Sequence, residues 1–301
     1  MRLEKNGRAT DVVSSLGSAM FSPVDTRSPA AVEQAVAALY RELFPQGNAR
    51  FVGEVFQWTA DCFEGRYAEF QAIDARYHDF EHTLQGTLCM ARLLAGRQRS
   101  GVQPGLNQRQ VELGLAGILL HDTGYLKVRN DREGTGAKYT LTHVNRSCEF
   151  AARLLGEKGF RADEISAVQQ MIRCTGVNVD LATIPFASEE IRTTGFALGT
   201  ADLLGQMAAA DYVDKLPVLF AEFEECARFN AGRSAAVGTF ASAEELMRKT
   251  PAFWEHYVLP KLERDFAAVY RFLNDPWPDG PNWYLQRIAE NIERLKRQLV
   301  N

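Results

Sequence analysis

The sequence predicts an all-α protein built as one domain, and three observations lead to that prediction. Apolar residues recur at helical spacing along most of the chain, and alternating strand patterns are hard to find. Helix boundaries carry recognisable signals, such as Ser28-Pro29, an N-cap followed by proline in the first turn. The 301 residues are 46% hydrophobic and 24% charged, which is enough apolar material for a large core, and no linker-like composition divides them.

The elements are expected in the following order. Residues 1–28 are polar and rich in Ser and Gly, and they predict a flexible N-terminal lead to a single domain over residues 29–301. Helical patterns cover residues 29–44, 51–63, 74–94, 109–125, 142–158, 163–174, 189–210, 212–229, 251–273 and 282–299. The pattern over 109–125 is apolar nearly all round, which indicates a deeply buried helix.

Charge and composition exclude several classes of function. The formal net charge is −4, so the basic surface of a general nucleic-acid binder is not expected. No apolar run is long enough to span a membrane, and the N-terminus has no signal-peptide core, so we expect no membrane association. The five cysteines are scattered and form no CxxC pair, which favours reduced thiols and a cytoplasmic location.

Histidines and acids form a candidate metal-binding set. Four of the five histidines lie in the second quarter of the chain. His78 and His82 are four residues apart within a predicted helix, which places them on one face. The pair His121-Asp122 ends the apolar helix, and Asp202 lies in another apolar helix, where a carboxylate is costly unless it is paired or metal-bound. Imidazole and carboxylate ligands suit a divalent transition ion.

The flanks of these residues resemble a known family. Residues 77–82 (YHDFEH) look like the YHNxxH opening of HD-type phosphodiesterases, and residues 142–147 (THVNRS) resemble the EHExRS segment of bacterial HD proteins. Residues 201–206 (ADLLGQ) resemble the family's final Asp motif. Together with the central His-Asp pair, this order resembles the HD superfamily of metal-dependent phosphohydrolases, over roughly residues 70–225, with the helices of 251–301 expected to pack on that core.

The resemblance implies an HD-domain helical bundle and a metal-dependent reaction. It implies that one divalent ion (Mn, Zn, Fe, Ni, Co or Mg) is held by His82, His121, Asp122 and Asp202. The ion would activate water for attack on a phosphate ester, with Asp122 in the catalytic centre. In YHNxxH enzymes the first histidine is the general acid, and here that role falls on His78.

Two departures from the family narrow this expectation. The string HDTGYLK at residues 121–127 lacks the second histidine of HDxxHxG, which weakens a specific assignment to cyclic nucleotides. Two-metal HD proteins add two histidines before the last Asp, and this chain offers only His143 there. One metal is therefore favoured over two, and the diiron oxygenase branch of the superfamily is disfavoured.

Substrate-binding candidates surround the motifs. Lys127, Arg146 and Arg173 are cations that could neutralise a phosphate. His143 could contact phosphate, bind a second metal or cap its helix. Gln206 follows the last acidic ligand by one helical turn and could hydrogen-bond a substrate base.

The expected function is hydrolysis of a small-molecule phosphate ester, a nucleotide or cyclic nucleotide being the favoured class. The alternatives are a binding module that holds metal and nucleotide without turnover, and, less favoured, a diiron oxygenase. The amphipathic helix over 282–299 could pack on the core or on a second chain, so a homodimer is one open arrangement.

Overall fold

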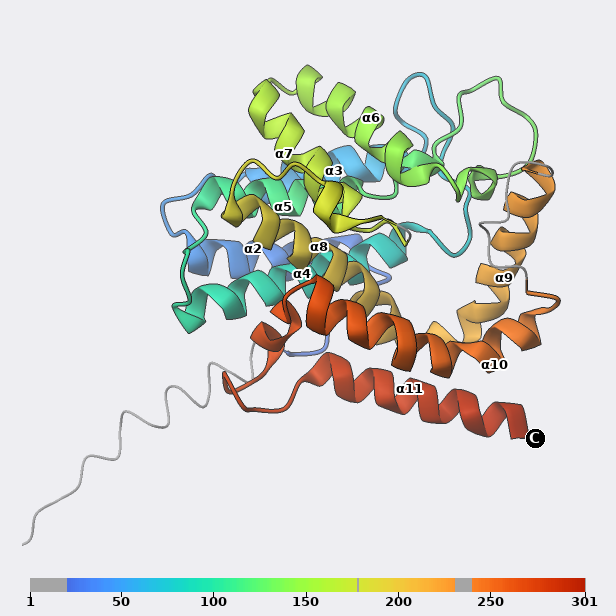
Figure 1. Ribbon diagram of the computed structural model, residues 1–301. Coiled ribbons are helices and arrows are strands. Elements are labelled where there is room, and N and C mark those ends of the chain that lie inside the picture. The colour runs from blue at the N-terminus through green and yellow to red at the C-terminus, as the bar shows by residue number, and fades with distance from the viewer. Residues whose placement is uncertain (1–20, 178, 231–239, 301) are drawn as a thin grey trace, which may run out of the picture.

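The chain folds into helices joined by short turns (Figure 1). In the computed structural model, residues 21–177, 179–230 and 240–300 are described, and within them there are two isolated β-bridges but no sheet. The all-α prediction is therefore confirmed, while residues 1–20 of the expected lead lie outside the described residues. The α-helices are α2 (Pro29–Leu43), α3 (Phe51–Phe63), α4 (Phe80–Ser100), α5 (Gln108–Leu120), α6 (His143–Glu157), α7 (Ala162–Arg173), α8 (Glu189–Met207), α9 (Tyr212–Phe229), α10 (Ala243–Phe253) and α11 (Trp283–Val300).

At the candidate site, two helix ends differ from the sequence patterns. α4 begins at Phe80 rather than at residue 74 because the Asp79 side chain accepts a hydrogen bond from the His82 N–H at 2.8 Å and caps the helix. His78 therefore precedes the helix, and the prediction that it shares a helical face with His82 is wrong. α5 ends at Leu120, so the His-Asp pair lies at the C-terminal end of the helix, where the chain turns.

The pattern over residues 251–273 does not form one helix. α10 begins earlier, at Ala243, and after Phe253 the chain continues through two π-helical turns, Trp254–Val258 and Lys261–Asp265, and a 3-10 turn, Val269–Leu273. Ala267 and Ala268 have left-handed backbones with φ of 51° and 54°, which interrupts the helical course. Apolar residues of this segment such as Val258, Leu262 and Phe266 are buried, as their helical spacing indicates. The spacing of apolar residues does not reveal a break in the helix.

The centre of the molecule is the contact between α4 and α8. A Cβ added at Gly205 in α8 would come within 2.7 Å of the Gly86 backbone nitrogen in α4, so this glycine lets the two helices touch. One cluster of buried apolar side chains extends around them, from Val32 in α2 to Leu295 in α11. Because both helices are held rigidly in this core, polar side chains that they carry keep fixed positions.

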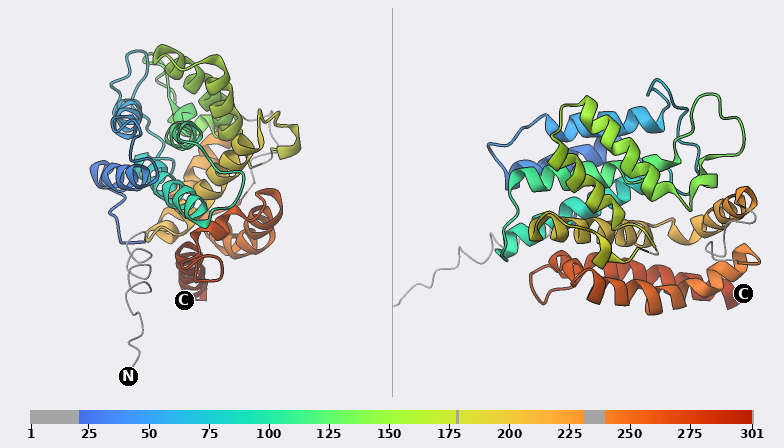
Figure 2. Two further views of the ribbon diagram at one scale, coloured as in Figure 1. Left: turned by 90° about the vertical axis from the view of Figure 1, so that its left-hand side faces the viewer. Right: turned by 45° about the horizontal axis from the view of Figure 1, so that its top comes forward.

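The remaining helices cover this central pair on different sides. Figures 1 and 2 show α6 and α7 on one side of the molecule and α11 along the opposite edge. The α11 side chains Ile288, Ile292 and Leu295 are buried against the body of the protein, at the spacing the amphipathic pattern predicts. None of the described helices is both long enough and apolar enough to cross a bilayer.

Candidate metal centre

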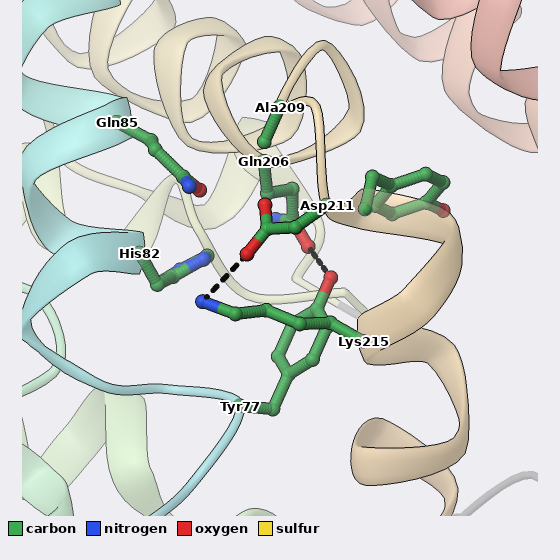
Figure 3. A pocket seen from close by; sticks show the side chains of 8 residues that line it. Tyr77, His82, Gln85, Gln206, Ala209, Asp211 and Lys215 are labelled. Atoms are coloured by element: carbon green, nitrogen blue, oxygen red, sulfur yellow. Dashed lines mark hydrogen bonds and ion pairs between the residues drawn. The ribbon is translucent and has the colours of Figure 1, made fainter. Parts of the chain in front are cut away.

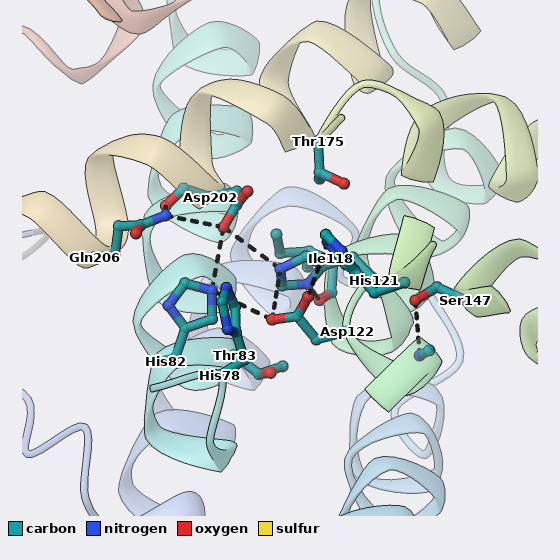
Figure 4. A network of polar contacts seen from close by, with 12 residues as sticks. His78, His82, Thr83, Ile118, His121, Asp122, Ser147, Thr175, Asp202 and Gln206 are labelled. Atoms are coloured by element: carbon teal, nitrogen blue, oxygen red, sulfur yellow. Dashed lines mark hydrogen bonds and ion pairs between the residues drawn. The ribbon is translucent and has the colours of Figure 1, made fainter. Parts of the chain in front are cut away.

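Three helices bring the histidines and acids together. His82 lies in the first turn of α4, which the Asp79 side chain caps, and Asp202 lies in the C-terminal half of α8. His121 and Asp122 follow α5, where the chain turns toward α6. Figure 4 shows the four side chains pointing toward one another from these separate elements. Residues far apart in sequence therefore converge on one buried point.

Each of the two carboxylates lies within contact distance of both imidazoles. Asp122 Oδ2 is 3.3 Å from His82 Nε2 and 3.3 Å from His121 Nε2. Asp202 Oδ1 is 3.3 Å from His82 Nε2 and 3.4 Å from His121 Nε2. His82, His121 and Asp122 are all buried, and this cluster could hold a metal ion. The expected convergence of these three residues is confirmed.

The nitrogen and oxygen atoms of this cluster are arranged to bind a cation and do not satisfy one another by hydrogen bonds. Although they face opposite charges, His121 Nε2 and Asp122 Oδ2 have no hydrogen-bond partner among the described residues. His121 Nδ1 lies 2.7 Å from the Ile118 carbonyl oxygen, so Nδ1 carries the proton and Nε2 presents its lone pair. Adjacent ligands bound about 2.1 Å from one divalent ion lie about 3.0–3.4 Å from each other, which matches the four imidazole–carboxylate separations given above. A buried polar atom without a partner is costly, and a metal ion would remove that cost.

The two carboxylates of the cluster favour a positive charge between them. Burial alone would lower the pKa of His82, but the carboxylates of Asp122 and Asp202 outweigh it and raise this pKa to about 10. Burial would raise the pKa of Asp202, but His121 and His82 outweigh it and lower that pKa well below its usual range. Two buried carboxylates thus stay ionised only because a cationic partner stands between them.

His78 belongs to a second, neighbouring arrangement. Its Nδ1 lies 2.6 Å from Oε2 of Glu222, a buried residue of α9, and the other Glu222 oxygen accepts the Tyr77 N–H at 2.7 Å. The sequence analysis missed Glu222. A signal was present, because this acid interrupts the buried stripe formed by Leu216 and Cys226 at helical spacing. A carboxylate on such a stripe predicts a buried partner.

His143 contacts the same aromatic ring as His78, and its own ring centroid lies 6.0 Å from that of His78. The Tyr125 ring stacks on His78, with centroids 4.6 Å apart, and on His143, with centroids 4.9 Å apart. His143 Nε2 is 3.9 Å from Asp122 Oδ1, and burial lowers the pKa of His143, which favours a neutral ring at pH 7. A Cβ added at Gly124 would come within 2.0 Å of the His143 carbonyl oxygen, so only glycine allows this approach.

A comparison with known protein families bears on this site. A model of the Npun_R2479-like family matches residues 30–271, which include every residue of the candidate metal centre described above. The chain belongs to the Npun_R2479-like family. No curated protein matches it.

Two of the expected phosphate ligands hold the loop that follows the His-Asp pair. In this Npun_R2479-like chain, Lys127 is buried, with Nζ 2.8 Å from an Asp74 carboxylate oxygen and 2.7 Å from the Gly134 carbonyl oxygen. Arg146 donates to the carbonyl oxygens of Gly124, at 2.7 Å, and Leu126, at 2.6 Å, and its guanidinium lies over the Tyr139 ring. Both cations are therefore committed to protein groups, in contrast to the free phosphate ligands that the sequence suggested.

The other two expected substrate ligands differ in their contacts. Arg173 ends α7, and its side chain makes no hydrogen bond or ion pair within the described ranges. Gln206 donates to the Asp202 backbone oxygen at 3.1 Å and approaches its carboxylate at 3.4 Å, while its own oxygen accepts the Tyr77 hydroxyl at 2.8 Å. Gln206 thus orients Asp202, a role that helical spacing alone could not distinguish from substrate binding.

A small hollow of about 10 Å³, room for about one water molecule, opens beside His82 (Figure 3). Its lining residues are Tyr77, His82, Gln85, Gln206, Ala209, Asp211, Tyr212 and Lys215. Lys215 was not predicted from the sequence. Its Nζ lies 3.2–3.3 Å from carboxylate oxygens of Asp79, Glu81 and Asp211, so acids outnumber the cation at this mouth.

Proposed function

We propose that this protein is a metal-dependent phosphohydrolase of the HD superfamily that cleaves a small-molecule phosphate ester. The observation that carries the proposal is the convergence of His82, His121, Asp122 and Asp202, with His121 Nε2 and Asp122 Oδ2 left without hydrogen-bond partners in the described structure. Two imidazoles and two carboxylates in a buried cluster are a donor set that divalent transition ions favour over Mg²⁺.

The four proposed ligands have two different roles in binding one ion. His82 and His121 supply neutral nitrogens, and Asp122 and Asp202 supply the negative charge that balances a divalent cation. Gln206 and the Ile118 carbonyl fix the positions of Asp202 and His121 from outside the ligand set. When bound, such an ion supplies Lewis acidity and an activated water for attack on phosphorus.

His78 is the proposed general acid. Glu222 holds the proton on its Nδ1 and stabilises the charged imidazolium, which leaves Nε2 as the atom that delivers a proton to the departing alkoxide. Tyr125 supports the ring of His78 by stacking against it. His78 is also partly exposed, with a side chain 15% accessible, as proton exchange with solvent requires.

The substrate class is proposed as a nucleotide or another phosphate ester of similar size. The test is metal analysis of the purified full-length chain, followed by a screen of phosphomonoesters and phosphodiesters with added Mn, Co, Ni or Zn. We expect about one ion per chain and turnover of at least one ester, both lost in His121→Ala. The matched control is His256→Ala, which changes an exposed histidine at a distance from these residues in sequence.

Other results would overturn the proposal. Absence of stoichiometric metal together with absence of phosphate release contradicts it. Tight nucleotide binding without product over hours supports the non-catalytic binding module instead. Two irons per chain with oxygen uptake would support the diiron oxygenase, with His143 as a ligand of the second ion.

A further inference from the structure

A second and larger hollow adjoins the one at His82. It encloses about 320 Å³, within the range of small-molecule sites. The residues that line it are Ser22, Pro23, Val24, Thr26, Gln85, Leu88, Arg92, Gly205, Ala208, Ala209, Ala210, Trp283, Tyr284 and Arg287. Gln85 and Ala209 line both hollows, so the two meet.

One face of α4 leads from the metal centre into this hollow. Gln85, Leu88 and Arg92 follow His82 at intervals of three, three and four residues, which places all four on one side of the helix. At 1.5 Å per residue, the Cα atoms of His82 and Arg92 are about 15 Å apart along the axis. The two hollows therefore form one elongated site that runs from His82, one of the proposed metal ligands, to Arg92.

Arg92 is a buried cation that no carboxylate neutralises in the described structure. Its residue is 4% exposed, and it donates to the Tyr284 hydroxyl at 3.2 Å and the Ser22 carbonyl at 2.7 Å. Phe21 and Trp283 present their rings 5.5 Å and 5.7 Å from its guanidinium carbon. Ring contacts of this kind stabilise a cation by less than burying an unpaired charge destabilises it.

The charge of the lining supports an anionic ligand. Among the described residues, Arg92 and Arg287 line the hollow and no Asp or Glu does, and Arg287 at the rim pairs with Glu290, which lies outside the lining. Lys127 shows the contrasting case of a buried cation that Asp74 neutralises. Arg97 is also buried without an ion pair in the described structure, but it donates to the Pro104 carbonyl and lines neither hollow.

We propose that the hollow around Arg92 binds an aromatic anion, with a planar ring against Trp283 and a carboxylate, sulfonate or phosphate group at the guanidinium. Leu88, Ala208 and Trp283 supply the apolar walls, and Arg92 supplies the charge. This proposal rests on the proposed function for its role in catalysis. There the ligand is the distal half of a phosphate ester that carries a second anionic group remote from the scissile phosphate.

Binding of two matched dyes to the metal-free full-length chain tests the proposal. 8-Anilino-1-naphthalenesulfonate carries the anion, and N-phenyl-1-naphthylamine has the same ring system without it. Fluorescence titration is expected to give at least tenfold tighter binding of the sulfonate. Arg92→Gln should abolish that preference, Arg92→Lys should retain part of it, and Arg99→Gln, an exposed arginine of the same helix that pairs with Glu42, should leave it unchanged.

A second variant keeps the test decisive if Arg92→Gln does not fold by circular dichroism. Ala209→Leu fills the junction of the two hollows without removing charge, and it should weaken sulfonate binding at least tenfold. Equal affinity for the two dyes, or unchanged binding in Ala209→Leu, overturns the proposal. Because the titration uses no metal and no turnover, its failure is distinct from failure of the phosphohydrolase proposal.

Discussion

The two ends of the elongated site on α4 differ in whether their charged side chains have partners of opposite charge. At the metal end, the cationic or protonatable groups His78 and Lys215 face carboxylates, and buried acids stay ionised against His82 and His121. At the far end, Arg92 is buried with no acid beside it in the described structure. The difference indicates that one end lacks a cation and the other lacks an anion. With a divalent ion supplying the missing cation at one end, a ligand that bridges both ends would carry an anionic group at each of them.

The largest expected effect comes from removing an acid at the metal end. Asp202→Asn should weaken metal binding more than 100-fold, since changing groups outside the ligand set already costs about 10–100-fold. Phosphate-ester turnover should disappear with the metal. Metal titration by calorimetry measures the change, and Asp211→Asn, at the mouth of the hollow, is the control. Full metal affinity in Asp202→Asn would remove Asp202 from the ligand set.

Removing the proposed general acid should separate chemistry from metal binding. His78→Asn should lower turnover about 10²–10⁴-fold, the usual contribution of a positioned acid. The metal content should stay at the wild-type level because His78 lies outside the proposed ligands. Steady-state kinetics and metal analysis on the same samples check this, with His256→Asn as the matched variant. A parallel loss of metal would make His78 a ligand instead.

Glu222→Gln should produce a smaller effect with a defined pH dependence. Burial raises the pKa of Glu222, but His78 and nearby backbone N–H groups outweigh it and lower this pKa. A depressed pKa contributes stability that is present above the unfolded value of about 4.3 and is lost as the pH falls through the folded value. The variant should therefore lose about 1–2 kcal/mol of unfolding free energy at pH 7.

The measurement is urea unfolding from pH 7 down to pH 3, and the difference from wild type should shrink below about pH 4. Glu224→Gln changes an exposed acid on the same helix and should show no such trend. A difference that stays constant across this range would mean that Glu222 is not held ionised by His78. Turnover of Glu222→Gln should fall about 10–100-fold because His78 loses its orienting partner.

The smallest effect on chemistry is expected at Arg146. Arg146→Gln should lower the unfolding free energy by about 1–3 kcal/mol, because two carbonyl oxygens of the loop lose a charged donor. KM for any substrate found should change less than about threefold, or roughly 0.6 kcal/mol. Denaturant unfolding and kinetics check this against Arg153→Gln, an exposed arginine of the same helix. A large rise in KM at unchanged stability would make Arg146 a phosphate ligand.

Much of the fold could be predicted because helical periodicity records which face of each element is buried. The Ser28 cap and the bounds of the helix over residues 51–63 were predicted correctly. The start of α4 was not, because the apolar pattern cannot tell whether the chain before Asp79 is helical or extended. The interruption at Ala267 and Ala268 was missed for the same reason. Periodicity reports burial, and backbone angles follow from tertiary packing.

The candidate metal centre was predictable only in part. His82, His121 and Asp122 could be named because their residue types and flanking motifs are visible in the sequence. The partner of His78 could not, since Glu222 lies 144 residues away and no local rule pairs them. The sequence suggests Lys127 and Arg146 as phosphate ligands because every cationic side chain near the motifs is a candidate for that role. Only the tertiary structure shows that Lys127 is already paired with Asp74 and that Arg146 already donates to backbone carbonyl oxygens.

By itself, the sequence determined an all-α chain, the residue types that can ligate a cation, and the apolar faces that bury them. The tertiary structure decided which charges meet. Three features are not properties of any local segment: the burial of Arg92 with no acid beside it in the described part of the chain, the pairing of His78 with Glu222, and the meeting of two hollows at Ala209. They arise because charge interacts through space, and the distances between helices are set by packing across the whole core.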